Sequence, residues 1–188
     1  MRLFAAIVPP DEVLEDLEEF LAPRREAAEF RWTVPEQWHL TLAFMPAVAD
    51  RHLDDLVERL TRAGRRRTAF GLRVAGGGAF PNPGRARVLW TGLEADEHAR
   101  TELDRLATGA RAAATKAGAD AEGGRFRAHL TLARLGRPAE VSSWVRLLDG
   151  YAGPPWTVED FTLIASHLGE GPRKRPRYEL LEAFTLGA

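Results

Sequence analysis

The chain of 188 residues contains the pentapeptide His-Leu-Thr-Leu-Ala twice, at 39–43 and at 129–133. The two copies lie 129 − 39 = 90 residues apart, and each is followed by a turn and a predicted helix. Because the chain has only five histidines, two identical pentapeptides that each contain one indicate an internal duplication. We therefore expect two halves related by a pseudo-two-fold axis.

Each copy of the pentapeptide is predicted to be a β-strand. In a strand, side chains at i and i+2 project from one face and those at i+1 and i+3 from the other. His39 and Thr41 should therefore share a face, as should His129 and Thr131, while the leucines anchor each strand in the core. If the two strands lie side by side, they present two imidazoles and two hydroxyls to one cleft.

The rest of the chain mixes predicted strands and helices. Strands are predicted over 2–8, 31–44, 68–76, 86–92, 126–134, 156–168 and 177–186, and helices over 11–27, 50–64, 95–117 and 138–149. Gly76-Gly77-Gly78 is interpreted as a turn. Strand pairs joined by short loops, together with helical crossovers, favour an α+β fold. No segment has the composition of a linker, so we expect a single domain over 1–188 made of two pseudo-symmetric lobes.

Composition narrows the function classes. The absence of cysteine removes thiol nucleophiles, thiolate metal sites and disulfides, and it fits a reducing cytoplasm. The net charge of −1 gives no overall field that would attract nucleic acid. The apolar run 3–8 is closed by Pro9-Pro10 and is too short for a signal peptide or a membrane span. We expect a cytoplasmic protein that does not contact a membrane.

Two histidines and two threonines on one surface suit phosphodiester hydrolysis. Because imidazole has a pKa of about 6.5, one ring can accept a proton from water while the other donates one to the leaving oxygen. The threonine hydroxyls can donate to phosphate oxygens where charge develops. Each strand offers one histidine without a carboxylate on the same face, whereas zinc usually has three or four protein ligands. We therefore expect neither a metal nor a cofactor.

The motifs resemble those of the two-histidine phosphoesterase superfamily, and more narrowly the RNA 2′,3′-cyclic phosphodiesterases, also named 2′-5′ RNA ligases. The resemblance runs over essentially the whole chain and rests on segments 2–7, 31–44, 80–90, 126–134 and the strand of Tyr178. It implies a two-lobed fold with antiparallel-rich sheets lining a central cleft and helices outside. It also implies hydrolysis of a terminal 2′,3′-cyclic phosphate to a 2′-phosphomonoester, with His39 as proton donor and His129 as proton acceptor. Sequence symmetry alone does not assign these two roles. Ala128 departs from the proline that the family often has at this position.

Other residues near the motifs are weaker candidates. The resemblance makes Arg134 a candidate for phosphate contact, but on an ideal strand it faces away from His129, so the strand must end or bulge first. Phe44 occupies the mirrored position and is a candidate for stacking on a base, with a core role as the alternative. The basic clusters 65–67 and 173–175 are either RNA contacts or solvated surface. The remaining histidines, His52, His98 and His167, lack the motif, and only the last lies near a basic cluster.

Several functions remain open at this point. The leading hypothesis is a monomeric, metal-independent hydrolase of RNA 2′,3′-cyclic phosphate ends. The same site could run 2′-5′ RNA ligation, the reverse chemistry, or act on small cyclic nucleotides. A non-catalytic module that binds RNA ends is the alternative of a different class, although a binder does not need two titratable bases.

Overall fold

The two copies of the pentapeptide lie in neighbouring strands at the centre of one sheet. In the computed structural model, which describes residues 1–187, β3 (Leu40–Met45) pairs antiparallel with β6 (His129–Ala139). Leu40 lies directly opposite Leu130, its equivalent in the other copy. The pairing therefore sets the two motifs side by side in opposite directions, as a two-fold axis between them requires.

Residues 1–187 form a nine-stranded sheet in the order β7-β4-β5-β6-β3-β1-β8-β9, with β2 beside β6, and every strand pair is antiparallel. The other strands are β1 (Leu3–Ile7), β2 (Arg31–Trp32), β4 (Phe70–Phe80), β5 (Ala86–Glu94), β7 (Trp156–Val158), β8 (Asp160–His167) and β9 (Arg177–Thr185). The helices are α1 (Asp11–Arg25), α2 (Leu53–Arg65), α3 (Glu97–Lys116) and α4 (Ser142–Asp149). Short 3-10 turns are η1 (Pro35–Gln37), η2 (Asp50–His52), η3 (Pro83–Arg85) and η4 (Pro172–Lys174). The predicted α+β class with antiparallel pairing is confirmed, as one curled sheet with helices outside it.

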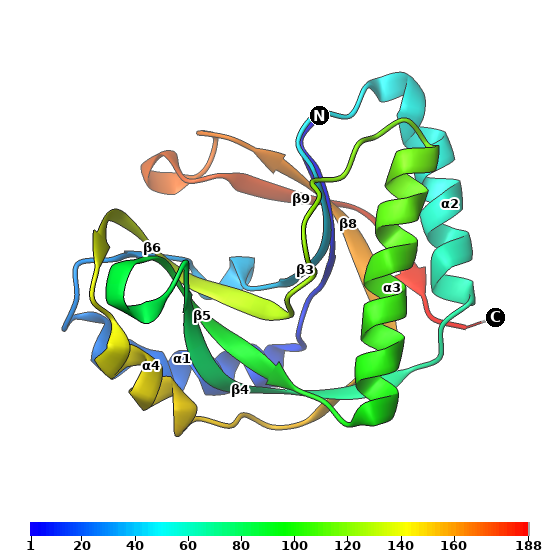
Figure 1. The fold of residues 1–188 in the computed structure, drawn as a ribbon. Helices are drawn as coiled ribbons and strands as arrows, with labels where there is room; N and C mark the ends of the chain where they lie inside the picture. The colour runs from blue at the N-terminus through cyan, green and yellow to red at the C-terminus, as the bar shows by residue number, and fades with distance from the viewer. Residues whose placement is uncertain (188) are drawn as a thin grey trace.

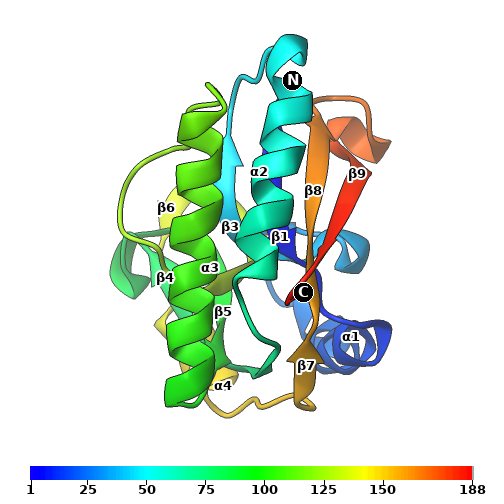
Figure 2. The same cartoon turned by 90° about the vertical axis from the view of Figure 1, so that its right-hand side faces the viewer.

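The order of elements repeats along the chain. Apart from the two-residue strand β2 and the 3-10 turns, the first half runs β1-α1-β3-α2 and the second β5-α3-β6-α4, and in each half the first strand pairs with the motif strand. The long helices α2 and α3 lie side by side at one end of the sheet, while α1 and α4 lie toward the other end (Figure 1, Figure 2). The repeated order supports two lobes within one domain, but the domain assignment over 1–188 stays a prediction.

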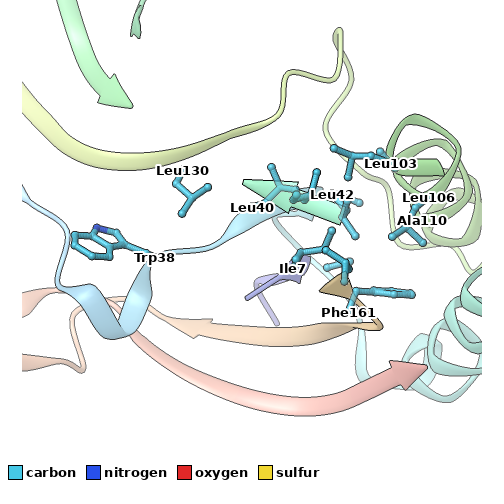
Figure 3. Packing of buried hydrophobic residues seen from close by; sticks show 14 of the residues in the cluster. Ile7, Trp38, Leu40, Leu42, Leu103, Leu106, Ala110, Leu130 and Phe161 are labelled. Carbon is cyan, nitrogen blue, oxygen red and sulfur yellow. The ribbon is translucent and has the colours of Figure 1, made fainter. Parts of the chain in front are cut away.

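Alternate residues of the motif strands form the centre of the core. Leu40, Leu42 and Leu130 are buried with 1% exposure or less and point into the core (Figure 3). Helix α3 covers them with an apolar face that includes Leu103 and Leu106. The leucines thus hold the strands from behind and leave the opposite face to the histidines and threonines.

Several element boundaries differ from the sequence predictions. The strand predicted over 31–44 is divided into β2 and β3 by η1, because a proline at its start favours a turn over continued pairing. The second motif strand begins at His129 and runs to Ala139, so α4 begins later than predicted. The strand predicted over 156–168 is broken between β7 and β8.

The triple glycine predicted to be a turn is part of β4 and leaves room for a large side chain. A Cβ added at Gly78 would lie 2.1 Å from the ring of Trp90 on the neighbouring strand β5. The missing side chain therefore lets the indole lie across β4. Local sequence favours a turn at three glycines, whereas the packing of this indole accounts for the strand.

None of the helices within residues 1–187 has the length and apolarity required to cross a bilayer.

Candidate active site

The two histidines enter the site in the same way. Nδ1 of His39 donates a hydrogen bond to the carbonyl oxygen of Gln37 at 2.7 Å, and Nδ1 of His129 donates to that of Arg127, also at 2.7 Å. The acceptor lies two residues upstream in both copies, so each ring is fixed by the backbone of its own segment. A proton on Nδ1 leaves Nε2 of the neutral ring as the atom that can exchange a proton with a substrate.

A one-residue β-bulge follows each threonine at equivalent positions. The extra residue is Leu42 in β3 and Leu132 in β6. Because a bulge shifts the alternation of side chains by one residue, Phe44 and Arg134 return to the face of the histidines. Both side chains line the same cleft. The expectation that the strand must end or bulge before Arg134 can reach the site is confirmed for the geometry.

One cleft of about 690 Å³ contains both histidines and both threonines. Five cations line it: Arg2, Arg31, Arg134, Lys174 and Arg175. None of these five forms an ion pair within residues 1–187, and Glu122 is the one acidic residue among the described residues that line the cleft. The surplus of unpaired positive charge suits an anionic ligand, although the chain as a whole carries a net charge of −1.

The chain has relatives that match it along nearly its full length. The family model described as LigT-like phosphoesterase matches residues 7–90 and 93–173. The chain belongs to this family.

The relatives of this phosphoesterase include named enzymes. An RNA 2′,3′-cyclic phosphodiesterase of Archaeoglobus fulgidus is 33% identical over 98% of this chain and 99% of its own. One of Thermus thermophilus is 34% identical over 99% of this chain and 90% of its own. The crystal structure of Escherichia coli LigT complexed with 3′-AMP superposes with a TM-score of 0.78, at 28% identity over 98% of this chain and 97% of that one. The family resemblance, the fold and the assignment to an enzyme class are thus confirmed.

Burial lowers the pKa of both imidazoles in this phosphoesterase. Burial lowers the pKa of His39 more than the hydrogen bond to Gln37 raises it. The positive charges of His129 and Arg134 lower the pKa further, so it falls from 6.5 to about 4. Burial also lowers the pKa of His129 against its backbone hydrogen bond, and Arg134 lowers it further. Both rings are therefore neutral at pH 7 in the free protein.

Aromatic rings pack against the two imidazoles in different ways. The ring of Phe4 stacks on His39 with centroids 4.5 Å apart, and Tyr178 meets the same imidazole edge-on at 5.7 Å. Phe80 meets His129 edge-on at 4.9 Å. The symmetric backbone frame therefore holds two chemically different environments.

Phe44 lines the cleft with one face covered. The guanidinium of Arg2 lies 4.4 Å above its ring centroid, which is the geometry of a cation–π contact. A base could therefore stack on Phe44 only at its other face, or on the guanidinium itself. The predicted stacking role of Phe44 stays a prediction, as do the phosphate contacts of Thr41, Thr131 and Arg134.

The two basic clusters have different surroundings. Lys174 and Arg175 of the cluster 173–175 line the cleft. In the cluster 65–67, at the end of α2, no residue lines the cleft, and Arg67 pairs with Glu102 at 3.3 Å.

The other three histidines take no part in the cleft. His167 contacts the carboxylates of Glu170 and Glu179, at 3.4 and 2.9 Å. His98 is exposed on α3, and His52 packs near Gly118. Within residues 1–187, no group of three or more His, Cys, Asp or Glu side chains is placed to hold a metal ion. The expected absence of metal and cofactor stays a prediction.

Sequence reasoning missed Gln37 and assigned no role to Arg2 or Tyr178. The sequence could have indicated Gln37, because in both copies the residue two positions before the histidine can accept a hydrogen bond from Nδ1 at its backbone carbonyl. Arg2 and Tyr178 reach the cleft only through the pairing of β1 with β3 and of β8 with β9. No local pattern reports such contacts.

Proposed function

We propose that this protein hydrolyses RNA 2′,3′-cyclic phosphate ends to 2′-phosphomonoesters, with His39 as the general acid and His129 as the general base. The observation that carries the proposal is the matched pair of imidazoles. Each has Nδ1 engaged by a backbone carbonyl, and both line one cationic cleft together with Thr41 and Thr131. The names of the nearly full-length relatives, RNA 2′,3′-cyclic phosphodiesterases, support the choice of substrate.

The proposed reaction is a displacement at phosphorus. Nε2 of His129 accepts a proton from water as the water oxygen bonds to phosphorus, and the P–O3′ bond breaks on the opposite side. Protonated Nε2 of His39 donates its proton to the departing O3′. The products are a 2′-phosphomonoester and a free 3′-hydroxyl, and solvent returns both rings to their starting protonation states.

The phosphate itself supplies the required protonation state. The free site keeps both rings neutral at pH 7, which suits the base but not the acid. A monoanionic phosphodiester between the rings replaces solvent with a negative charge and raises the pKa of His39. Thr41 and Thr131 donate hydroxyl hydrogen bonds to the non-bridging oxygens, and Arg134 balances their charge.

Two alternatives use the same residues. Ligation of RNA ends through a 2′-5′ bond is the same displacement at the cyclic phosphate, with the 5′-hydroxyl of a second RNA end in place of water and O3′ as the leaving oxygen. A non-catalytic RNA-end-binding module would need the cationic cleft but not two imidazoles with free Nε2 atoms. The paired imidazoles therefore favour an enzyme over a binder.

The test is hydrolysis of a short RNA that ends in a 2′,3′-cyclic phosphate, with EDTA present, by wild type and by His39→Ala and His129→Ala variants. We expect a 2′-phosphate product, and each variant should lose about a hundredfold to ten-thousandfold in kcat. His98→Ala removes an exposed histidine outside the cleft and serves as the matched control, with unchanged turnover. Unchanged turnover in either cleft variant would refute the two-histidine mechanism, and full inhibition by EDTA would refute the metal-independent one.

A further inference from the structure

We propose that Lys174 and Arg175 form a second phosphate subsite, which binds the phosphodiester one nucleotide upstream of the cyclic end. This inference rests on the proposed function and narrows its substrate class. A small cyclic nucleotide has no upstream phosphodiester, whereas the end of an RNA strand has one. The subsite would therefore make a polynucleotide end the preferred substrate.

Lys174 and Arg175 lie in the loop between β8 and β9, called here the basic loop, and their charges are available to a ligand. Lys174 and Arg175 line the cleft that contains His39 and Thr41, and neither pairs with a carboxylate within residues 1–187. Arg177, two residues further along, is by contrast engaged with Glu170 at 3.5 Å. Unpaired cations in a cleft attract phosphate groups, and this cleft contains a second cation, Arg134, on another strand.

The loop is held in a fixed shape. Arg173 and Lys174 both have positive φ, 56° and 61°, which is uncommon for residues other than glycine. Two consecutive residues in this region cost free energy that the surrounding contacts must supply, and such strain concentrates at functional sites. A hydrogen bond of 2.7 Å from the Gly171 amide to the Arg175 carbonyl closes the loop.

Gln37 joins the loop to the segment that carries His39. The side-chain Nε2 of Gln37 donates to the carbonyl oxygen of Pro176 at 2.7 Å, while the backbone carbonyl oxygen of Gln37 accepts from Nδ1 of His39. A phosphate bound at Lys174 and Arg175 is thereby held in a defined position relative to the imidazole. The cations on the opposite strands, such as Arg134, remain for the cyclic phosphate between the two histidines.

The basic cluster at the end of α2 provides a matched control. Arg65 and Arg66 are exposed, form no ion pair within residues 1–187, and do not line the cleft. Gly64 hydrogen-bonds to Gly187 beyond the far end of β9, whereas the loop precedes β9. At about 3.3 Å per residue, the strand separates the two clusters by roughly 26 Å. In Figure 1 the β8–β9 loop and the end of α2 lie at opposite sides of the molecule.

The experiment compares kcat/KM for a trinucleotide that ends in a 2′,3′-cyclic phosphate with that for the corresponding cyclic mononucleotide. Wild type should prefer the trinucleotide, and the double variant Lys174→Ala/Arg175→Ala should lose that preference. Neutralising one phosphate contributes a slope of about −0.7 to log K against log salt for a single strand. Between 50 and 200 mM salt, wild type should thus lose about 2.6-fold more in kcat/KM for the trinucleotide than the double variant does. The variant Arg65→Ala/Arg66→Ala should keep both the preference and the salt dependence of wild type.

Equal kcat/KM for the two substrates in wild type, or a preference that survives in the double variant, would overturn the subsite while leaving the hydrolase intact. Absence of turnover with either substrate would instead overturn the proposed function. Binding of a fluorescent trinucleotide that ends in a 2′-phosphate, measured by anisotropy, then still decides the subsite. We expect weaker binding by the double variant and wild-type binding by the control, and equal binding by all three proteins would refute the inference.

Discussion

The half-buried imidazole of His39 makes the free energy of unfolding depend on pH. Its pKa in the folded protein is about 4, mainly because of burial, against about 6.5 in the unfolded chain. Folding therefore favours the neutral ring. The stability that the neutral ring contributes to the folded protein is fully present above pH 6.5 and is lost as the pH falls toward 4. At pH 5 this imidazole is almost fully protonated in the unfolded chain but only about one-tenth protonated in the folded protein. Protonation of the unfolded chain therefore lowers the free energy of unfolding by about 2 kcal/mol.

Replacing His39 with Asn removes the titrating group and keeps a side-chain amide that can donate to the carbonyl of Gln37. Urea unfolding at pH 8 and at pH 5, followed by far-UV circular dichroism, gives the free energy of unfolding of each protein. Between these pH values, wild type should lose about 2 kcal/mol more than His39→Asn. His98→Asn, which removes an exposed imidazole on α3, should show the wild-type difference. An equal loss in wild type and His39→Asn would refute the lowered pKa and with it the desolvated state of the ring.

Three further outcomes test the site. The kcat/KM of wild type should reach its maximum below pH 6.5, because it reports the free enzyme, in which the pKa values of both cleft histidines are lowered; a maximum at pH 8 would contradict this. Thr41→Val and Thr131→Val should each lower kcat about a hundredfold with a smaller change in KM, as expected for donors that act on developing charge, and a change confined to KM would refute that role. Gly78→Ala should destabilise the fold by about 1–3 kcal/mol in urea unfolding, because its Cβ would meet the Trp90 ring at 2.1 Å. Gly71→Ala is the control, because Gly71 also lies in β4 and its added Cβ would be 3.9 Å from the nearest atom. This variant should change stability less.

The repeated pentapeptide predicted the centre of the fold because its information is local. Alternation placed Leu40 and Leu130 in the core and the histidines and threonines on the other face. The duplication left the pairing of the two motif strands as a condition, and the structure meets it by pairing β3 with β6. The helices were predicted from apolar periodicity, which also depends on neighbours only three and four residues away. These features required no knowledge of distant contacts.

The two β-bulges, and the presence of Lys174 and Arg175 in the cleft, could not be predicted from local sequence. A bulge is defined by the strand opposite, so the extra residues at Leu42 and Leu132 depend on β1 and β5 rather than on their own sequence. The spacing of Arg134 showed only that something must interrupt the strand. Lys174 and Arg175 reach the cleft because β9 returns beside β8, a pairing that no local pattern specifies.

The position of the basic loop also bears on which histidine is the acid. If the upstream phosphate binds Lys174 and Arg175, the terminal ribose lies on the side of the loop, which Gln37 ties to His39. In a displacement with entering and leaving oxygens in line, the ribose O3′ then departs toward His39 and water enters beside His129. The backbone holds the two imidazoles in the same way, and the loop on one side of the cleft gives them different roles.

A substrate with sulfur in place of O3′ tests this assignment directly. A thiolate leaves with little need for a proton, because a thiol has a pKa of about 8.5. The activity of His39→Ala on a 2′-O,3′-S-cyclic phosphorothiolate trinucleotide should therefore recover toward that of wild type. His129→Ala should remain impaired on the same substrate, because the attacking water still needs its base. Recovery of His129→Ala in place of His39→Ala would reverse the two roles and would place the RNA strand on the opposite side of the cleft from the loop.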